Sequence, residues 1–163
     1  MTTHASKPYI GIGMDGLIAK WYAGITRNNL PYFKKDAQKL AKLLKPGSAV
    51  LDLAPGPGYL SIELAKLGSF RITGLDISQT FVEIGRENAK LEGVPVEFQQ
   101  GDAAHMPFED GTFDLLVCRA AFKNFSEPLA AINEMRRVLK PGGKAVINDL
   151  RGDATDADNV SSR

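Results

Sequence analysis

The sequence predicts an α/β fold: a doubly wound, mainly parallel sheet of about five strands with helices on both faces. Five short apolar runs bounded by Gly, Pro or Asp have the character of strands, and most of the segments between them have helical periodicity. Parallel strands need long crossovers, which right-handed β-α-β units provide. The five predicted strands are SAVLDL at 48–53, RITGLD at 71–76, VEFQQ at 96–100, FDLLVC at 113–118 and KAVIND at 144–149.

The predicted helices between the strands rest on apolar residues that recur on one helical face. These residues are Leu60, Leu64 and Leu67; then Phe81, Ile84 and Ala89; then Ile132, Met135 and Leu139. The connection HMPFEDGT at 105–112 is too short for a full helix, so a compressed crossover or a single turn is expected there.

Two predicted helix-to-strand corners have a similar sequence, LLKPGSAVLD at 43–52 and VLKPGGKAVI at 138–147. Lys favours a helix C-terminus, Pro cannot continue the helix and Gly permits the turn, so the similarity indicates helix termination and not an internal repeat. Before the first corner, residues 14–44 predict two helices broken near 28–31. The first carries Trp21 and Tyr22, which are either core aromatics or part of a cover over a ligand.

Composition narrows the class of protein and its partners. The chain has 163 residues, 44% of them hydrophobic, which fits one domain with a real core. The net charge is +1 without a long block of one sign, so neither nucleic acid nor a membrane surface is an expected partner. The N-terminus lacks the apolar core of a signal peptide, and no run approaches the ~20 apolar residues of a membrane span. The single cysteine, Cys118, is expected to be a buried thiol. The expected location is therefore cytoplasmic.

The loop in LDLAPGPGYL, residues 51–60, follows the first predicted strand, where doubly wound sheets bind ligands. Gly56 and Gly58 would let the backbone approach a ligand closely. Asp76 stands 20 residues after Gly56 at the end of the second strand, where a carboxylate can accept hydrogen bonds from ribose hydroxyls. The pattern therefore predicts a nucleoside ligand.

The prolines of this loop argue against a pyrophosphate. Pro55 and Pro57 each remove an N–H donor, and Ser61 stands where the dinucleotide fingerprint has its third glycine. Asp52 places a negative charge directly before the loop, which would repel an anion and favour a cation or an amino group. A phosphate-free nucleoside fits these features best.

Four segments, VLDLAPGPGYL, GLDIS, QGDAAHMPFEDGTFDLLVC and RRVLKPGG, together resemble the ordered motifs of class I S-adenosylmethionine-dependent methyltransferases, over roughly residues 36–150. Their branch is similar to the ubiquinone and menaquinone biosynthesis methyltransferases. The resemblance implies a Rossmann-like sheet, S-adenosyl-L-methionine as cofactor and a small organic methyl acceptor. No metal site is expected. The segment CRAAFKNF after the fourth strand lacks the Asn/Asp-Pro-Pro-aromatic signature of enzymes that methylate amino groups of nucleic acids.

The resemblance also implies the positions that hold the cofactor. Around the methionine part these are Asp52, Ala54, Gly56, Gly58 and, through its backbone, Arg119. Asp76 would hold both ribose hydroxyls. On the adenine side they are Ile77, Asp102, Ala103 and Met106, and Tyr22 would join from the N-terminal helix. Each acid has a structural alternative: Asp52 as a helix or loop cap, Asp76 as a turn former and Asp102 as a cap.

The sequence departs from the family pattern in two places. Ala54 replaces the first glycine of the loop and Pro55 follows it, so a stiffer turn is expected. The family's sheet ends in an antiparallel hairpin that this chain does not encode, because residues 151–163 form a polar tail. The expected domain therefore has a helical cap at 1–44, a core at 45–150 and an exposed fifth strand, which implies a fragment of a longer chain or self-association through that edge.

The catalytic residues are not predicted. Methyl transfer from a sulfonium is an in-line displacement that positioning can drive, so a base is optional. Candidate bases are His105, Asp149 and Tyr22, and residues that could face the acceptor are Arg119, Lys123 and Asn124. The alternatives to a methyltransferase are a cofactor-binding protein without catalysis and a nicotinamide-dependent oxidoreductase, which the prolines and the missing third glycine oppose.

Overall fold

The computed structural model describes residues 14–149, so the predicted tail at 151–163 lies outside the described residues. Its centre is a five-stranded, all-parallel sheet in the order β3-β2-β1-β4-β5, which confirms the predicted fold class. The chain builds outward from β1 to β3 and then returns to the other side of β1. The strands are β1 Ala49–Leu53, β2 Arg71–Asp76, β3 Val96–Gln100, β4 Phe113–Arg119 and β5 Leu139–Asn148.

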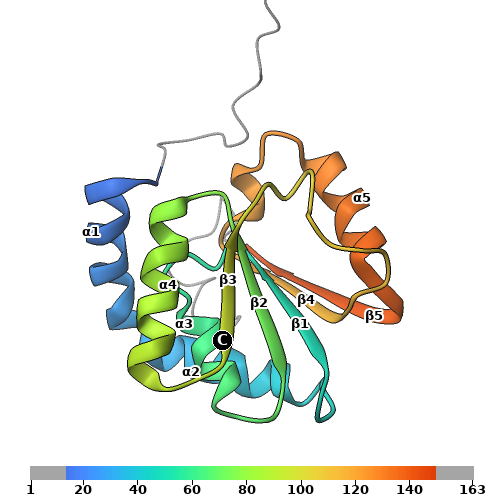
Figure 1. Cartoon of the computed structure of the whole chain (residues 1–163), viewed down its shortest axis with the longest axis horizontal. Helices are drawn as coiled ribbons and strands as arrows, with labels where there is room; N and C mark the ends of the chain where they lie inside the picture. The colour runs from blue at the N-terminus through green and yellow to red at the C-terminus, as the bar shows by residue number, and fades with distance from the viewer. Residues whose placement is uncertain (1–13, 150–163) are drawn as a thin grey trace, which may run out of the picture.

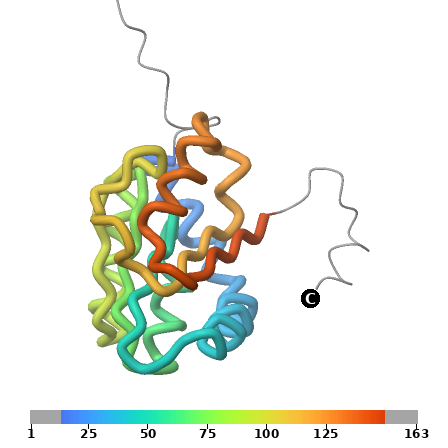
Figure 2. Tube along the Cα trace, turned by 90° about the vertical axis from the view of Figure 1, so that its right-hand side faces the viewer, coloured from blue at the N-terminus to red at the C-terminus, as the bar shows by residue number. Residues whose placement is uncertain are grey.

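Helices cover both faces of the sheet, as Figure 1 shows. On one face lie α1 Gly16–Thr26, the 3-10 turn η1 Arg27–Asn29, α2 Leu30–Ala41, α3 Tyr59–Ala65 and α4 Gln79–Glu92. On the other face lies α5 Pro128–Val138, preceded by the short turn η2 Phe122–Asn124 and drawn in orange and red at the front of Figure 2. No described helix is long and apolar enough to cross a membrane.

The core divides into an apolar cluster on each face, because alternate residues of a strand point to opposite sides. β1 is buried along its whole length. Leu51 and Leu53 face the α5 side with Leu116, while Val50 faces α2 and α3 with Val117. The sheet is therefore fixed from both sides, and its carboxyl edge is a rigid base for a site.

The two predicted helix-to-strand corners are confirmed, with one difference. Gly47 and Gly142 have φ values of 81° and 79°, a left-handed conformation that favours glycine. At the second corner, however, the chain never leaves the sheet. β5 begins at Leu139, directly after α5, and pairing passes from Phe113–Leu139 to Leu115–Lys144 around an irregularity. The placement of Leu139 on the preceding helix was therefore wrong.

The N-terminal segment consists of two helices with a break at η1, as predicted. Its aromatic residues are not in the core. Trp21 is 67% exposed, and Tyr22 is 37% exposed with its ring edge-to-face against Phe81, at 6.0 Å between centroids. Leu67 and Ile132, assigned to apolar helix faces, are each 45% exposed. The connection between β3 and β4 contains no helix, in agreement with its predicted shortness.

Candidate functional site

The predicted cofactor residues gather at the carboxyl edge of the sheet, where the strand order reverses between β1 and β4. Asp76 is the last residue of β2 and Arg119 the last of β4. Asp52 lies between them on β1, in register with Gly74 and Val117. Because parallel strands end at the same edge, the fold brings these charged groups and the loop 54–58 together.

The backbone of the loop 54–58 has no N–H group left for a phosphate. Two of its five residues are prolines, which have no N–H. The other three donate inside the protein: Ala54 N to Leu75 O (2.8 Å), Gly56 N to Asp76 Oδ2 (2.9 Å) and Gly58 N to Pro55 O (3.1 Å). The loop is thus shaped by its own hydrogen bonds and cannot form the amide cradle that a pyrophosphate needs.

The two loop positions require glycine for different physical reasons. Gly56 has a φ of 55°, and the space where a Cβ would lie is open. Gly58 has a φ of 80°, and a Cβ there would come within 2.5 Å of the Phe98 ring. Gly56 therefore leaves room beside the site, whereas Gly58 is required for the packing of α3 on β3.

Ala54 and Ala120 are the described non-glycine residues with positive φ, at 56° and 57°. An alanine in this left-handed region is strained by contact of its Cβ with the backbone. Ala54 follows β1 and Ala120 follows β4, so both strained residues lie at the carboxyl edge. Backbone strain of this kind is concentrated at functional sites in proteins.

Asp76 is buried, and both of its carboxylate oxygens accept hydrogen bonds from backbone N–H groups. Oδ2 accepts from Gly56 and Oδ1 from Ser78, each at 2.9 Å. Burial raises the pKa of this carboxyl, although these two N–H donors oppose the shift. Asp76 thus has the turn-forming role that the sequence allowed as an alternative to ribose binding. It also ties the end of β2 to the loop after β1. Its contact with ribose stays a prediction.

Asp52 is 2% exposed and accepts a hydrogen bond of 2.6 Å from the Ser61 hydroxyl. Burial raises the pKa of Asp52 to about 7, the Ser61 hydrogen bond lowers it, and the neighbouring Asp76 carboxyl raises it further. A buried acid with a pKa near neutrality is a frequent property of functional sites. Ser61, at the third position of the dinucleotide fingerprint, therefore serves to hold Asp52.

The predicted adenine side is partly open. Ile77 is 38% exposed, which leaves an apolar surface directly after Asp76. Asp102 Oδ1 accepts from Ala104 N at 2.9 Å, so the capping alternative is also present, and its Oδ2 lies 3.6 Å from His105 Nδ1. Met106 is buried in the α5-side core cluster. Its side chain packs in that core and does not form an exposed cover.

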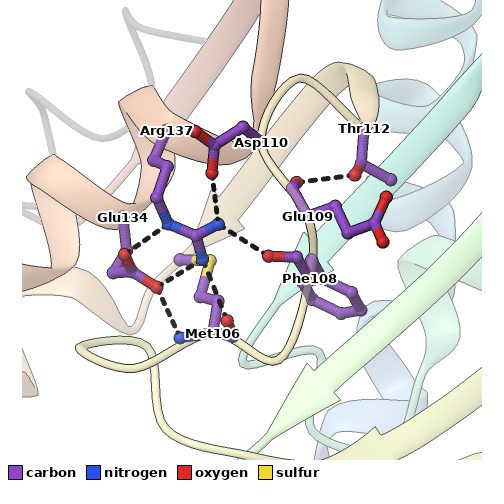
Figure 3. A network of polar contacts seen from close by, with 7 residues as sticks. All are labelled: Met106, Phe108, Glu109, Asp110, Thr112, Glu134 and Arg137. Atoms are coloured by element: carbon purple, nitrogen blue, oxygen red, sulfur yellow. Dashed lines mark hydrogen bonds and ion pairs between the residues drawn. The ribbon is translucent and has the colours of Figure 1, made fainter.

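An arginine holds the segment that carries these residues in place, as Figure 3 shows. All five N–H donors of Arg137, on α5, have acceptors. They reach the main-chain oxygens of Met106 (3.0 Å) and Phe108 (2.6 Å), the Asp110 carboxylate (2.9 Å) and both Glu134 oxygens (2.7 and 2.8 Å). Glu134 also accepts from Met106 N at 2.7 Å. The network takes the place of a crossover helix and fixes the segment 106–110, which follows the predicted adenine-side residues Asp102 and Ala103.

Arg119 carries a second polar cluster toward α2. Its Nε donates to Asp36 Oδ2 at 3.1 Å, and its guanidinium lies 4.6 Å from the centre of the Phe33 ring. A cavity of about 280 Å³ opens beside this pair. It is lined by Asp36, Lys39, Leu40, Leu60, Val117, Arg119, Val146 and Asn148.

The candidate bases are dispersed. The His105 side chain is 76% exposed and the Tyr22 ring rests on Phe81. Asp149 Oδ2 accepts from Lys123 N at 2.7 Å. No geometric feature selects one of them, so the catalytic residue remains unassigned. Cys118 is fully buried, as predicted, and burial raises the pKa of its thiol to about 12.

Two site neighbours have no signal in the sequence. Asp15 accepts a hydrogen bond of 2.6 Å from the Ser78 hydroxyl, which ties the start of α1 to the end of β2. Asp36 pairs with Arg119 across 83 residues. Both contacts join segments distant in the sequence, and no local pattern encodes such a pairing.

Comparisons with known proteins agree with this geometry. The profile of the methyltransferase domain family matches residues 51–147. A ubiquinone/menaquinone biosynthesis C-methyltransferase from Ruegeria sp. is 36% identical over 116 residues, which are 69% of this chain and 46% of that protein. The chain spans 41–49% of the length of the curated relatives that it matches.

Solved structures show the same fold. A protein of Methanococcus maripaludis assigned as an S-adenosyl-L-methionine-dependent methyltransferase superposes with a TM-score of 0.81 at 29% identity, covering 99% of this chain and 73% of that one. The cyclase SpnF superposes with a TM-score of 0.69 at 31% identity, covering 76% and 48%. The motifs, the strand order and these matches together show that the chain belongs to the class I S-adenosylmethionine-dependent methyltransferases.

Proposed function

We propose that the chain binds S-adenosyl-L-methionine at the carboxyl edge of its sheet and transfers the methyl group to a small organic acceptor. The observation that carries this proposal is the loop 54–58, whose N–H groups are all absent or used, lying beside the buried acids Asp52 and Asp76. Such an edge suits a ligand that has hydroxyls, an amino group and a positive charge but no phosphate.

The chain's own residues fit this cofactor. Each Asp76 oxygen that accepts one backbone N–H retains a second lone pair for a ribose hydroxyl. Asp52 would offset the charge of the methionine part, and Gly56 leaves open space beside it. On the adenine side, the residues that would contribute are Ile77, Asp102 and Ala103. When bound, the cofactor supplies an electrophilic methyl group, and the protein's part is to orient the acceptor and exclude water.

The acceptor is proposed from the relatives. Because the Ruegeria sp. protein is named a C-methyltransferase of quinone biosynthesis, a ring carbon of a quinone precursor is the first acceptor to test. Acceptor sites in this fold are built from variable loops, so this choice is less direct than that of the cofactor. A cytoplasmic location is expected from the sequence and stays a prediction.

A second candidate function is cofactor binding without methyl transfer. One observation favours it: the similar structure of SpnF belongs to a cyclase. A fold of this type does not by itself determine the reaction.

Calorimetric titration with S-adenosylhomocysteine tests the binding proposal. The wild-type chain should bind with micromolar affinity, Asp76→Asn should lose most of this binding, and NADH should not bind. Asp114→Asn is the matched control, because Asp114 also accepts a backbone N–H, from Ala49 at 2.8 Å, but lies at the opposite end of β4. Equal losses in the two variants, or preferential binding of NADH, would refute the proposed site.

Transfer of a labelled methyl group to a demethylated quinone analogue separates the two candidate functions. Binding together with turnover supports the enzyme. Binding of S-adenosylhomocysteine without turnover of any acceptor in a chemically varied panel supports the non-catalytic alternative.

A further inference from the structure

The cavity beside Arg119 has an apolar end and a polar end. On β4 and β5, Val117 and Val146 are register partners, and both line the cavity. Two residues further on, Arg119 and Asn148 form the next pair on the same face, because side chains at i and i+2 of a strand point to one side. The polar pair therefore lies at the carboxyl edge of the sheet, where the proposed cofactor site lies, and the valines lie further from that edge.

Two helices complete the walls of the cavity. Leu40 of α2 and Leu60 of α3 are buried and belong to the same apolar cluster as Val117. Asp36 stands one turn before Leu40 on α2, and Lys39 is the remaining charged residue of that helix in the lining. Apolar walls with a few convergent polar groups are the usual form of a site for a small molecule.

The cavity adjoins the predicted methionine part of the cofactor. Val117 has Asp52 of β1 as its register partner on one side and Val146 of β5 on the other. Val50 lies in the apolar cluster on the α2 and α3 side of the sheet, and Asp52, two residues later, points to that side as well. Because adjacent strands are about 4.8 Å apart, a ligand in the cavity would lie beside the methyl donor.

The Arg119 guanidinium is only partly used within the protein. Of its five N–H donors, Nε donates to Asp36 Oδ2 at 3.1 Å, and the other four have no acceptor among residues 14–149. The Phe33 ring lies against the guanidinium at 4.6 Å and limits its orientation. The side chain is 30% exposed, so a ligand can reach its terminal nitrogens. Their planar fork matches the two oxygens of a carboxylate.

The charged residues that line the cavity carry one excess positive charge. They are Asp36, Lys39 and Arg119. Asp36 lies between the two cations, with Oδ2 bonded to Arg119 and Oδ1 4.0 Å from the Lys39 ammonium nitrogen. Asp52 also interacts electrostatically with Arg119, but its pKa is about 7 and it would face the positive charge of the cofactor. The polar end of the cavity therefore favours an anionic group.

We propose that this cavity binds the methyl acceptor, and that the acceptor is a small apolar ring compound with a carboxylate. The ring would contact Val117, Val146 and Leu60. The carboxylate would accept hydrogen bonds from the terminal nitrogens of Arg119, with Lys39 nearby. The volume of about 280 Å³ is at the lower end for ligand sites, which suits a small compound. The ligand's identity as the acceptor rests on the proposed methyl transfer, to which this inference adds the chemical class of the acceptor.

Calorimetric titration of the chain with 2-naphthoate and with its neutral isostere 2-naphthamide tests the site, in the presence and absence of saturating S-adenosylhomocysteine. At neutral pH the naphthoate should bind about tenfold or more tightly than the amide, since a carboxylate adds charge-assisted hydrogen bonds. Equal affinities for the two compounds, or no binding of 2-naphthoate, would overturn the proposal.

Variants of the polar end locate the carboxylate. Arg119→Lys retains the charge and loses the planar fork, so the affinity for 2-naphthoate should fall from the wild type to Arg119→Lys and further to Arg119→Gln. Lys39→Gln should also weaken the naphthoate, and it leaves the bond between Arg119 and Asp36 in place. Lys42→Gln is the matched control, because Lys42 is an exposed cation at the end of α2 that does not line the cavity. It should bind like the wild type.

A variant of the apolar end locates the ring. Val146 is half-buried on β5, so Val146→Phe should fill the cavity and abolish binding of both naphthalene compounds. Binding of S-adenosylhomocysteine should remain. Circular dichroism establishes whether each variant is folded, and Lys39→Gln and Val146→Phe keep the test decisive if the Arg119 variants do not fold.

The failure of this inference differs from that of the proposed function. If S-adenosylhomocysteine binds but Val146→Phe and Lys39→Gln leave the affinity for 2-naphthoate unchanged, the cavity is not the acceptor site and the cofactor proposal stands. If 2-naphthoate binds as expected but S-adenosylhomocysteine does not, the methyl-transfer proposal and the acceptor role are both overturned.

Discussion

Ala54 and Ala120 show, at the scale of single residues, that the carboxyl edge is held in a strained backbone conformation. Their φ values of 56° and 57° cost an L-residue about 1–2 kcal/mol, and glycine avoids this cost. Ala54→Gly also makes the unfolded chain more flexible, which offsets part of the gain. We expect Ala54→Gly to raise the free energy of unfolding by about 0.5–1 kcal/mol, measured by urea denaturation.

The control for this prediction is an alanine in an ordinary helical conformation. Ala130 lies in α5, where a glycine lowers stability by up to about 1 kcal/mol. Ala120→Gly should behave like Ala54→Gly, and Ala130→Gly should have the opposite sign. If Ala54→Gly is as destabilising as Ala130→Gly, the backbone at 54 is not strained.

Asp52 should make the free energy of unfolding depend on pH, with a defined sign. Its pKa is about 7 in the folded protein against 3.8 for an unperturbed carboxyl, so the folded state holds the proton more tightly. The resulting stabilisation is complete below about pH 4 and is lost as the pH rises through 7, on the order of a few kcal/mol. Asp52→Asn should therefore match the wild type near pH 4 and exceed its free energy of unfolding at pH 8.

Asp114→Asn is the control of opposite sign. Hydrogen bonds from Ala49 N and the Lys140 ammonium group lower the pKa of Asp114, so its stabilisation exists above the unfolded pKa and is lost as the pH falls. Asp114→Asn should lose stability at neutral pH. Asp76 has a raised pKa as well, so a smaller slope remains in Asp52→Asn. If the free energy of unfolding changes with pH in the same way for the wild type and Asp52→Asn, then ionisation of Asp52 does not destabilise the folded protein and the raised pKa is wrong.

At the scale of elements, α3 and α4 pack on the sheet around the ring of Phe98, which three glycines surround. Phe98 is 3% exposed, and a Cβ added at Gly58, Gly74 or Gly85 would come within 3.0 Å of its ring. For Gly74 the distance to Cδ1 would be 2.5 Å, with Pro55 Cγ at 3.0 Å on another side. We expect Gly74→Ala to lower the free energy of unfolding by about 3 kcal/mol, since both neighbours are confined.

Two comparisons isolate this steric cause. Gly24 lies in α1 with nothing within 4 Å of the added Cβ, so Gly24→Ala should raise stability by about 0.5–1 kcal/mol. In a Phe98→Leu background, Gly74→Ala should cost less than in the wild type. An unchanged cost in that background would point to a cause other than contact with the ring.

The elements themselves were largely predictable from local pattern. Four predicted strands agree with β1 to β4 within about one residue, because short apolar runs between turn residues are local signals. The start of β5 was not predicted: Pro141 and Gly142 indicate an end of structure, yet backbone pairing with β4 continues on both sides of their turn. The sequence left open whether Trp21 is buried or exposed, because an apolar periodicity does not tell which side of a helix is covered.

The candidate site was predictable to the extent that its residues stand at fixed offsets from β1. The sequence placed Asp52, Asp76 and the loop 54–58 at one edge, and the structure does the same. It gave no sign that Gly58 packs on Phe98, because this contact depends on where β3 lies in the sheet.

At the scale of the whole molecule, the sheet of the described residues has two edge strands, β3 and β5, with different protection. β3 has five residues, its Phe98 O accepts two hydrogen bonds from the Arg86 guanidinium at 3.0 and 2.7 Å, and Glu97 is exposed on it. β5 is ten residues long; its first half contains Lys140, Pro141 and Lys144, whereas its second half, residues 145–148, exposes Ile147 to 44%. Figure 2 shows its red end at the border of the described molecule. Charged residues and prolines on an edge strand resist pairing with another chain, whereas an exposed apolar stretch such as 145–147 promotes it.

We therefore expect the chain to self-associate through β5. Sedimentation velocity should show a dimer fraction that grows with protein concentration, and Ile147→Lys should reduce this fraction because a charge on the edge opposes strand pairing. Leu129→Lys places the same charge at an exposed leucine of α5, away from the edge, and should leave the association unchanged. A wild-type chain that remains monomeric at every concentration, or an equal effect of both lysines, would mean that β5 does not pair with a second copy and that its edge is protected in another way.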